Sequence, residues 1–223
     1  MDQLLVAVVP LALGAAVSPT LLALQLLVLS GPTHRLARAW SLTLGAALVL
    51  GAFSLLCTTA LQRVRPTHAH RSATDAAVLT ASGVLLGALA IRSRIRRPTP
   101  GENHTSKTAE RLTTAATPWF IGVGALGMVV NFSTLLLVLP AIHEITRSSA
   151  TTPAKVAVFT IMYVVVLLPV LVPVVFASVL GRRADGLLDA THQWVGRNSR
   201  TIGTVIEAIF AVYLLVKGVR ALL

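Results

Sequence analysis

The chain has 223 residues, of which 55% are hydrophobic and only 12% are charged, and its mean hydropathy is +0.78. Soluble domains carry about 25% charged residues, so this composition excludes an ordinary soluble protein and predicts an all-α membrane protein. The formal net charge of +11 is distributed between apolar runs. Basic residues between apolar runs orient a protein in the membrane and contact anionic lipid headgroups. We therefore expect no nucleic-acid partner.

Six apolar stretches follow one another along the chain and predict six transmembrane helices. They cover residues 4–30, 39–61, 76–91, 118–142, 156–180 and 202–222. The third has about 16 residues, or ~24 Å of helix, which is shorter than a bilayer core of ~30 Å. The first begins without a basic segment and is longer than a signal-peptide core of about 15 residues, so we expect it to be retained as a span.

A polar, basic linker separates the third stretch from the fourth. It covers residues 92–117 and begins with four arginines between Arg92 and Arg97. When Lys and Arg are counted on alternate sides of the six spans, the linker side has twelve and the other side has seven. The positive-inside rule therefore predicts a cytoplasmic linker that contacts anionic headgroups, with both termini outside.

Two segments of the chain align without a gap and predict an internal repeat. The segment LGAAVSPTLLALQLLVLS starts at Leu13 and the segment LGMVVNFSTLLLVLPAIH starts at Leu126. Three spans separate them, so the second copy crosses the membrane in the opposite direction, as in many secondary transporters. We therefore expect two inverted three-helix repeats, residues 1–91 and 118–223. The alignment pairs Gly14 with Gly127, Ser18 with Asn131 and Thr20 with Ser133.

The first and fourth stretches are each interrupted near their middle by polar residues. Pro19 has no N–H, so it leaves the carbonyl of Ala15 without its helical donor, and at membrane depth such a carbonyl must face protein or water. A plain proline kink is the alternative for Ser18–Pro19, and a simple interhelical hydrogen bond is the alternative for Asn131. The substrate-binding residues that we predict are Ser18, Pro19, Thr20, Gln25, Asn131 and Ser133.

Glu207 is the only acidic residue inside an expected span, which makes it a candidate for proton coupling. An interfacial carboxylate beside Arg200 is the alternative. Four further residues are predicted to break or hinge their helices: Gly14, Gly127, Pro169 and Pro173.

Motifs that support other chemistries are weak or missing. The sequence has no phosphate-binding loop, catalytic serine motif or metal-ligand cluster, so we expect no enzyme activity, no cofactor and no metal. His68 and His70 are interpreted as part of a solvated loop. The single cysteine, Cys57, excludes a disulfide within the chain, and the pair Gly83 and Gly87 is typical of helix packing.

Three motifs carry a family resemblance that covers nearly the whole chain: ALGAAVSPTLLALQLLVLS, NFSTLLLVLPA and YLLVKGVR. Together with the six spans and the polar linker, they resemble the sulfolipid-addressing or peptidoglycolipid-addressing (GAP) proteins of the lysine-exporter superfamily. The resemblance implies a bacterial cytoplasmic (inner) membrane exporter in which Ser18, Pro19 and Asn131 are central. Relatives often carry an Asn-Pro-Lys break in the fourth span, whereas this chain has Asn131-Phe132-Ser133.

These observations lead to three functional hypotheses. The first is export or translocation of cell-envelope lipids or glycolipids through a midplane site between broken helices 1 and 4. The second is a proton-coupled exporter of a small solute such as an amino acid, with Glu207 as the coupling group. The third is a non-transporting accessory subunit of a lipid transporter. The partners considered are membrane lipids, a second copy of the chain and a larger lipid transporter.

Overall fold

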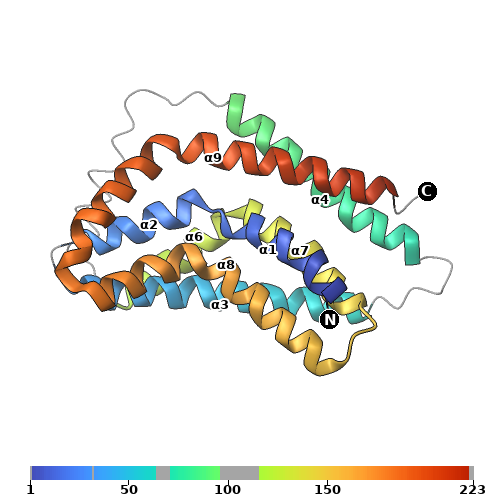
Figure 1. Ribbon diagram of the computed structural model, residues 1–223, viewed down its shortest axis with the longest axis horizontal. Coiled ribbons are helices and arrows are strands. Elements are labelled where there is room, and N and C mark those ends of the chain that lie inside the picture. The colour runs from blue at the N-terminus through green and yellow to red at the C-terminus, as the bar shows by residue number, and fades with distance from the viewer. Residues whose placement is uncertain (1, 32, 64–70, 96–115, 221–223) are drawn as a thin grey trace.

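The computed structural model describes residues 2–31, 33–63, 71–95 and 116–220, and within them all regular structure is helical (Figure 1). The expectation of an all-helical protein is therefore confirmed. The helices in chain order are α1 (Asp2–Ala16), α2 (Pro19–Leu29), α3 (Arg35–Arg63), α4 (Arg71–Ile95), α6 (Trp119–Val130), α7 (Phe132–Arg147), α8 (Thr152–Leu180), the short 3-10 helix η2 (Gly181–Ala184) and α9 (Asp185–Arg220).

The described helices contain three to five candidate membrane spans. Three segments are long and apolar enough by themselves, namely α3, α8 and Thr201–Val219 within α9. Two bent pairs, α1 with α2 and α6 with α7, qualify when each pair is taken as one span. The apolar part of α4, Ala77–Arg92, is too short to qualify, so the third expected span and the total of six remain predictions.

The two bent pairs occupy the centre of the bundle, with α4 and α9 side by side on one flank and α3 and α8 on the other (Figure 1). Glycines allow the closest approaches. A Cβ on Gly45 of α3 would collide with the carbonyl oxygen of Ile121 in α6, and a Cβ on Gly124 of α6 would collide with that of Leu42. On the flank, a Cβ on Gly83 would lie 3.0 Å from Leu215 Cγ of α9, in agreement with the predicted packing role.

Two element boundaries differ from the sequence prediction. The helix α4 continues to Ile95, so the first arginines of the basic run extend a helix rather than open a linker. The helix α9 begins at Asp185, although a loop was expected until residue 201. Apolar residues at helical spacing, Leu188 and Val195 among them, explain this early start. Residues 96–115 of the linker, and His68 with His70, lie outside the described residues.

The three tryptophans lie near one end of the bundle. Trp40 lies in the first turns of α3, Trp119 is the first residue of α6, and Trp194 lies in the first part of α9. These helix starts are at the left in Figure 1. Their exposed fractions are 45%, 54% and 59%. Exposed tryptophans at one level are typical of the boundary between hydrocarbon and headgroups, so this end of the bundle has the character of a membrane interface.

Candidate functional site

The first break separates α1 from α2 by two residues and bends the span by 51°. Ser18 has an extended backbone (φ −113°, ψ 94°), and Pro19 is the first residue of α2. Proline is well tolerated there because the first N–H of a helix has no helical acceptor. The Ser18 hydroxyl oxygen accepts a hydrogen bond from the backbone N–H of Leu21 at 3.3 Å, which caps α2. The break therefore has a complete local capping arrangement.

The carbonyl freed by Pro19 has a partner in the other broken span. Thr134 Oγ1, which lies in α7, donates a hydrogen bond to the carbonyl oxygen of Ala15 at 3.1 Å. The Thr134 side chain is almost completely buried, with an exposed fraction of 3%. The prediction that this carbonyl faces protein or water is therefore confirmed, because protein supplies the donor.

The second break, between α6 and α7, consists of Asn131 alone and bends the span by 71°. No proline is present there, and Asn131 has φ −78° and ψ 60°. Its side-chain nitrogen donates to Ser18 Oγ at 2.7 Å and to Thr134 Oγ1 at 2.6 Å. The departure from an Asn-Pro-Lys motif thus does not prevent the fourth span from breaking, and the polar side chain at the break bonds to the first broken span through Ser18.

Together these residues form a connected polar group that we call the junction: the side chains of Ser18, Asn131 and Thr134 and the carbonyl of Ala15. Thr134 accepts from Asn131 and donates to Ala15. The Ser18 oxygen accepts from both Leu21 and Asn131. Both of its lone pairs are occupied, so further bonding at Ser18 depends on its O–H proton.

A small polar cavity of about 170 Å³ adjoins the junction. It brings together six of the predicted site residues, namely Gly14, Pro19, Thr20, Asn131, Ser133 and Glu207. The remaining lining residues are Val17, Thr134, Leu137, Ser199, Gly203, Thr204 and Ile206. Both broken spans and α9 therefore contribute to one polar space.

Glu207 is the only titratable residue among those that line this small cavity. Its carboxyl group interacts with the side chain of Ser133. Its Oε2 atom is buried and, within the described part of the chain, has no hydrogen-bond partner. An unpaired carboxylate oxygen beside two helix breaks is a functional candidate by its placement alone.

Other predicted residues lie apart from the small cavity. Gln25 is completely buried and donates from Nε2 to the carbonyl oxygen of Ala39 at 3.3 Å and to Thr43 Oγ1 at 3.4 Å. It therefore links α2 to α3 and lines neither this cavity nor the larger one described next. Gly127 also lines neither cavity, because it faces Leu21 and Leu24 of α2.

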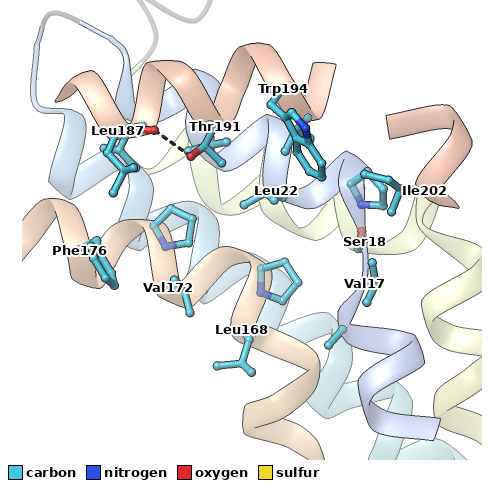
Figure 2. Close-up of a pocket in the computed structure, with 17 residues that line it drawn as sticks. Val17, Ser18, Leu22, Leu168, Val172, Phe176, Leu187, Thr191, Trp194 and Ile202 are labelled. Carbon is cyan, nitrogen blue, oxygen red and sulfur yellow. Dashed lines mark hydrogen bonds between the residues drawn. The ribbon is translucent and has the colours of Figure 1, made fainter. Parts of the chain in front are cut away.

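A larger cavity, about 510 Å³ in volume and almost entirely apolar, lies on the other side of the first break (Figure 2). Its walls come from α2, α8 and the first part of α9. The lining residues are Ala16, Val17, Ser18, Pro19, Leu22, Leu26, Leu168, Pro169, Val172, Pro173, Phe176, Leu187, Leu188, Thr191, Trp194, Val195 and Ile202. Pro169 and Pro173 are wall residues of an unbroken α8, so a hinge role for them stays a prediction.

The sequence interpretation missed Thr134 and the first part of α9. Thr134 follows Asn131 by one helical turn, and this spacing was the available signal. In α9 the signal was the helical spacing of Leu187, Thr191 and Trp194, which all face the large cavity.

Residues 8–220 match the family model described as Sap, sulfolipid-1-addressing protein. Among curated proteins and among solved structures, no match was found.

Proposed function

Because the chain belongs to the Sap, sulfolipid-1-addressing protein family, we propose that it is a membrane transporter for an amphiphilic cell-envelope lipid. In this proposal, the lipid is translocated or exported across the bacterial cytoplasmic membrane through a site at the junction. The headgroup of the lipid meets the polar side chains there. The adjoining apolar cavity accommodates the hydrophobic part.

The observation that carries this proposal is the hydrogen-bonded contact between the two breaks. Irregular backbone is tolerated at membrane depth only where it is buried in protein or lines a cavity. Here Asn131 and Ser18, which are 113 residues apart, are joined at 2.7 Å, and cavities lie on both sides of the first break. Broken helices that meet in this way are typical of the substrate sites of secondary transporters.

We also propose that the bundle consists of six spans in two inverted repeats, with α1 to α4 equivalent to α6 to α9 in order. The packing supports this equivalence. When each helix of a packed pair is replaced by its counterpart in the other repeat, the result is again a packed pair. The helix α3 packs on α6, and α8 packs on α1; α2 packs on α9, and α7 packs on α4. Two further packed pairs, α4 with α9 and α3 with α8, each consist of a helix and its own counterpart.

The two cavities favour a lipid over a small polar solute. A small solute needs an enclosed polar pocket, and the polar cavity of about 170 Å³ is smaller than typical ligand sites of about 300–1,000 Å³. The apolar cavity of about 510 Å³ lies within that range. Its lining offers few polar groups, which suits a hydrocarbon chain rather than an amino acid.

A reconstitution experiment tests the lipid proposal directly. Purified protein is placed in phosphatidylcholine vesicles that contain NBD-labelled sulfatide, a sulfated glycolipid, and dithionite quenching measures transfer between leaflets. We expect accelerated transfer relative to protein-free vesicles. Transfer at the protein-free rate would contradict an autonomous sulfolipid transporter. If a co-reconstituted larger lipid transporter then restored transfer, the chain would be an accessory subunit.

Glu207 favours a second candidate function, a proton-coupled exporter of a small solute. Its unpaired Oε2 in the small polar cavity is the specific observation. In vesicles with an imposed pH gradient, Glu207→Gln is expected to abolish the dependence of transport on that gradient. The matched control is Glu144→Gln, since Glu144 pairs with Lys217 at 2.7 Å and does not line the small polar cavity. Gradient-dependent transport by Glu207→Gln would exclude the coupling role.

A further inference from the structure

We propose that the large apolar cavity binds a single acyl chain of a lipid, which enters sideways from the bilayer between α8 and α9. The inference rests on the proposed function for its role in transport, but the binding itself can be tested separately. It assigns the acyl chain to the cavity walls and the headgroup to the junction, where the proposed function places it.

The cavity is shaped as a groove with α2 as its floor. The helix α2 packs against both α8 and α9, whereas α8 and α9 diverge beyond the short η2 that joins them. In Figure 2, Leu168, Val172 and Phe176 of α8 line one side, and Leu187, Thr191 and Trp194 of α9 line the other, with Leu22 of α2 between them. The space between the two walls therefore faces outward from the bundle.

The mouth of the groove is apolar, which identifies the medium that it meets. The wall residues Val172, Phe176 and Leu187 have exposed fractions of 44%, 44% and 58%, while Leu26 on the floor is only 2% exposed. In a membrane protein, exposed apolar side chains of this kind contact hydrocarbon. Apolar cavities stay dry, so hydrocarbon rather than water is the expected occupant.

The two ends of the groove give the bound chain a direction. The inner end is at Ser18, next to the junction, and the outer end is at Leu187 and Phe176 (Figure 2). Trp194 lies between these ends, and α9 continues from it to Ile202, which is beside Ser18 (Figure 2). Arg197, one helical turn beyond Trp194 towards Ile202, is exposed and can attract an anionic headgroup. The headgroup is therefore assigned to the inner end, and the end of the acyl chain points towards Leu187 and Phe176.

Photocrosslinking tests this assignment without any transport measurement. The probe is phosphatidylglycerol with a diazirine in one acyl chain, at low mole fraction in phosphatidylcholine vesicles that contain the full chain. Adducts are located by mass spectrometry. We expect adducts on the floor residues Leu22 and Leu26, which lipid on the outer surface of the bundle cannot reach.

Filling the groove should remove these floor adducts. Val172→Trp, on one wall, and Leu187→Trp, on the other, are each expected to lower them by about tenfold, which corresponds to about 1.4 kcal/mol of lost binding. The matched control is Val164→Trp, because Val164 is also on α8 with an exposed fraction of 46% but does not line the cavity. This control should retain the floor adducts.

The outcomes separate the inference from the proposed function. Adducts no more frequent on Leu22 and Leu26 than on the outward-facing Leu44 and Leu48 of α3 would overturn the groove as a binding site. Equal loss in Val164→Trp would also contradict it. Floor adducts in a protein that does not translocate sulfatide would leave the acyl-chain site intact and exclude the transport proposal alone.

Discussion

The two broken spans bend at equivalent positions of the alignment but are held by different means. At the first break, Pro19 removes a helical donor and Ser18 caps the next helix locally. At the second, the Asn131 side chain makes no capping hydrogen bond to the start of α7 and instead donates to Ser18 in the other span. The span without a proline is the more strongly bent, at 71° against 51°. A helix break in this bundle is therefore not a property of proline alone.

Prolines elsewhere in the chain support this conclusion. Pro10 in α1, Pro140 in α7 and the pair in α8 all lie inside continuous helices. An internal proline removes a hydrogen bond at each of these positions, yet no break follows. At Pro19 the helix does separate, and there the freed carbonyl of Ala15 accepts a hydrogen bond from Thr134 of α7. An internal proline by itself is therefore not sufficient to break a helix in this bundle.

The largest expected effect comes from Asn131→Ala, which removes both contacts that Asn131 makes across the junction. Each neutral hydrogen bond contributes about 1 kcal/mol, and the acceptors left at Ser18 and Thr134 are buried. We expect the translocation of labelled sulfatide to fall by about tenfold or more, while the protein still inserts. Asn198→Ala is the control, because the Asn198 amide donates only within its own helix, to Trp194 O. Normal translocation by Asn131→Ala would falsify the midplane site.

The next effect is on stability and comes from Thr134→Val, which preserves the side-chain shape but removes the donor to Ala15. A buried carbonyl without a donor costs about 1–3 kcal/mol. For a chain of this size we expect the thermal midpoint to fall by about 2–4 °C for each kcal/mol, as measured by thermal unfolding in detergent. Thr160→Val is the matched control, since Thr160 is exposed and donates to Val156 O of its own helix. Similar midpoints for the two variants would contradict a role for Thr134.

A smaller effect should distinguish the paired glycines Gly14 and Gly127. A Cβ on Gly14 would collide with the ring of Phe210, whereas a Cβ on Gly127 would lie 3.1 Å from Leu24 Cδ2. Overpacking costs about 1–3 kcal/mol, and alanine recovers about 1 kcal/mol of helix propensity. Gly14→Ala should therefore lower the thermal midpoint more than Gly127→Ala, with a net loss of about 1 kcal/mol.

Two further variants test the cause of that difference. Phe210→Leu combined with Gly14→Ala should restore the midpoint, because the ring that collides is removed. Gly122→Ala should not lower the midpoint, because nothing lies within 4 Å of the added Cβ. A loss in Gly122→Ala equal to that in Gly14→Ala would show that helix flexibility, rather than contact with α9, is responsible.

The smallest expected effect comes from Pro19→Ala. Pro19 occupies the first position of α2, where proline and alanine are both tolerated, and the contacts of Ser18 and Thr134 are retained. We expect translocation close to the unsubstituted level and a stability change within about 1 kcal/mol. A loss as large as that of Asn131→Ala would mean that the proline, rather than the junction, holds the first break.

Part of the site could be predicted from the sequence because its signals are local. The missing N–H of Pro19 and the polar residues in apolar runs are visible in the chain itself. The alignment of Ser18 with Asn131 then located both breaks. Gln25 was placed wrongly, because a polar residue two helical turns from Ser18 on the same side of an ideal helix was expected in the cavity. Ser18 has an extended backbone and caps α2 from outside the helix, so the helical spacing does not relate its direction to that of Gln25, which faces α3.

The sequence by itself determined that the chain is helical and membrane-like and where its helices are weakened, since composition and missing backbone donors act within a few residues. Only the tertiary structure decided which side chains form hydrogen bonds with the groups at these breaks. Thr134 reaches Ala15 across 119 residues, and Asn131 reaches Ser18 across 113. Only the tertiary structure, too, placed Glu207 beside both breaks and the first part of α9 over the apolar groove. Contacts over such separations depend on how the helices pack, which no local pattern specifies.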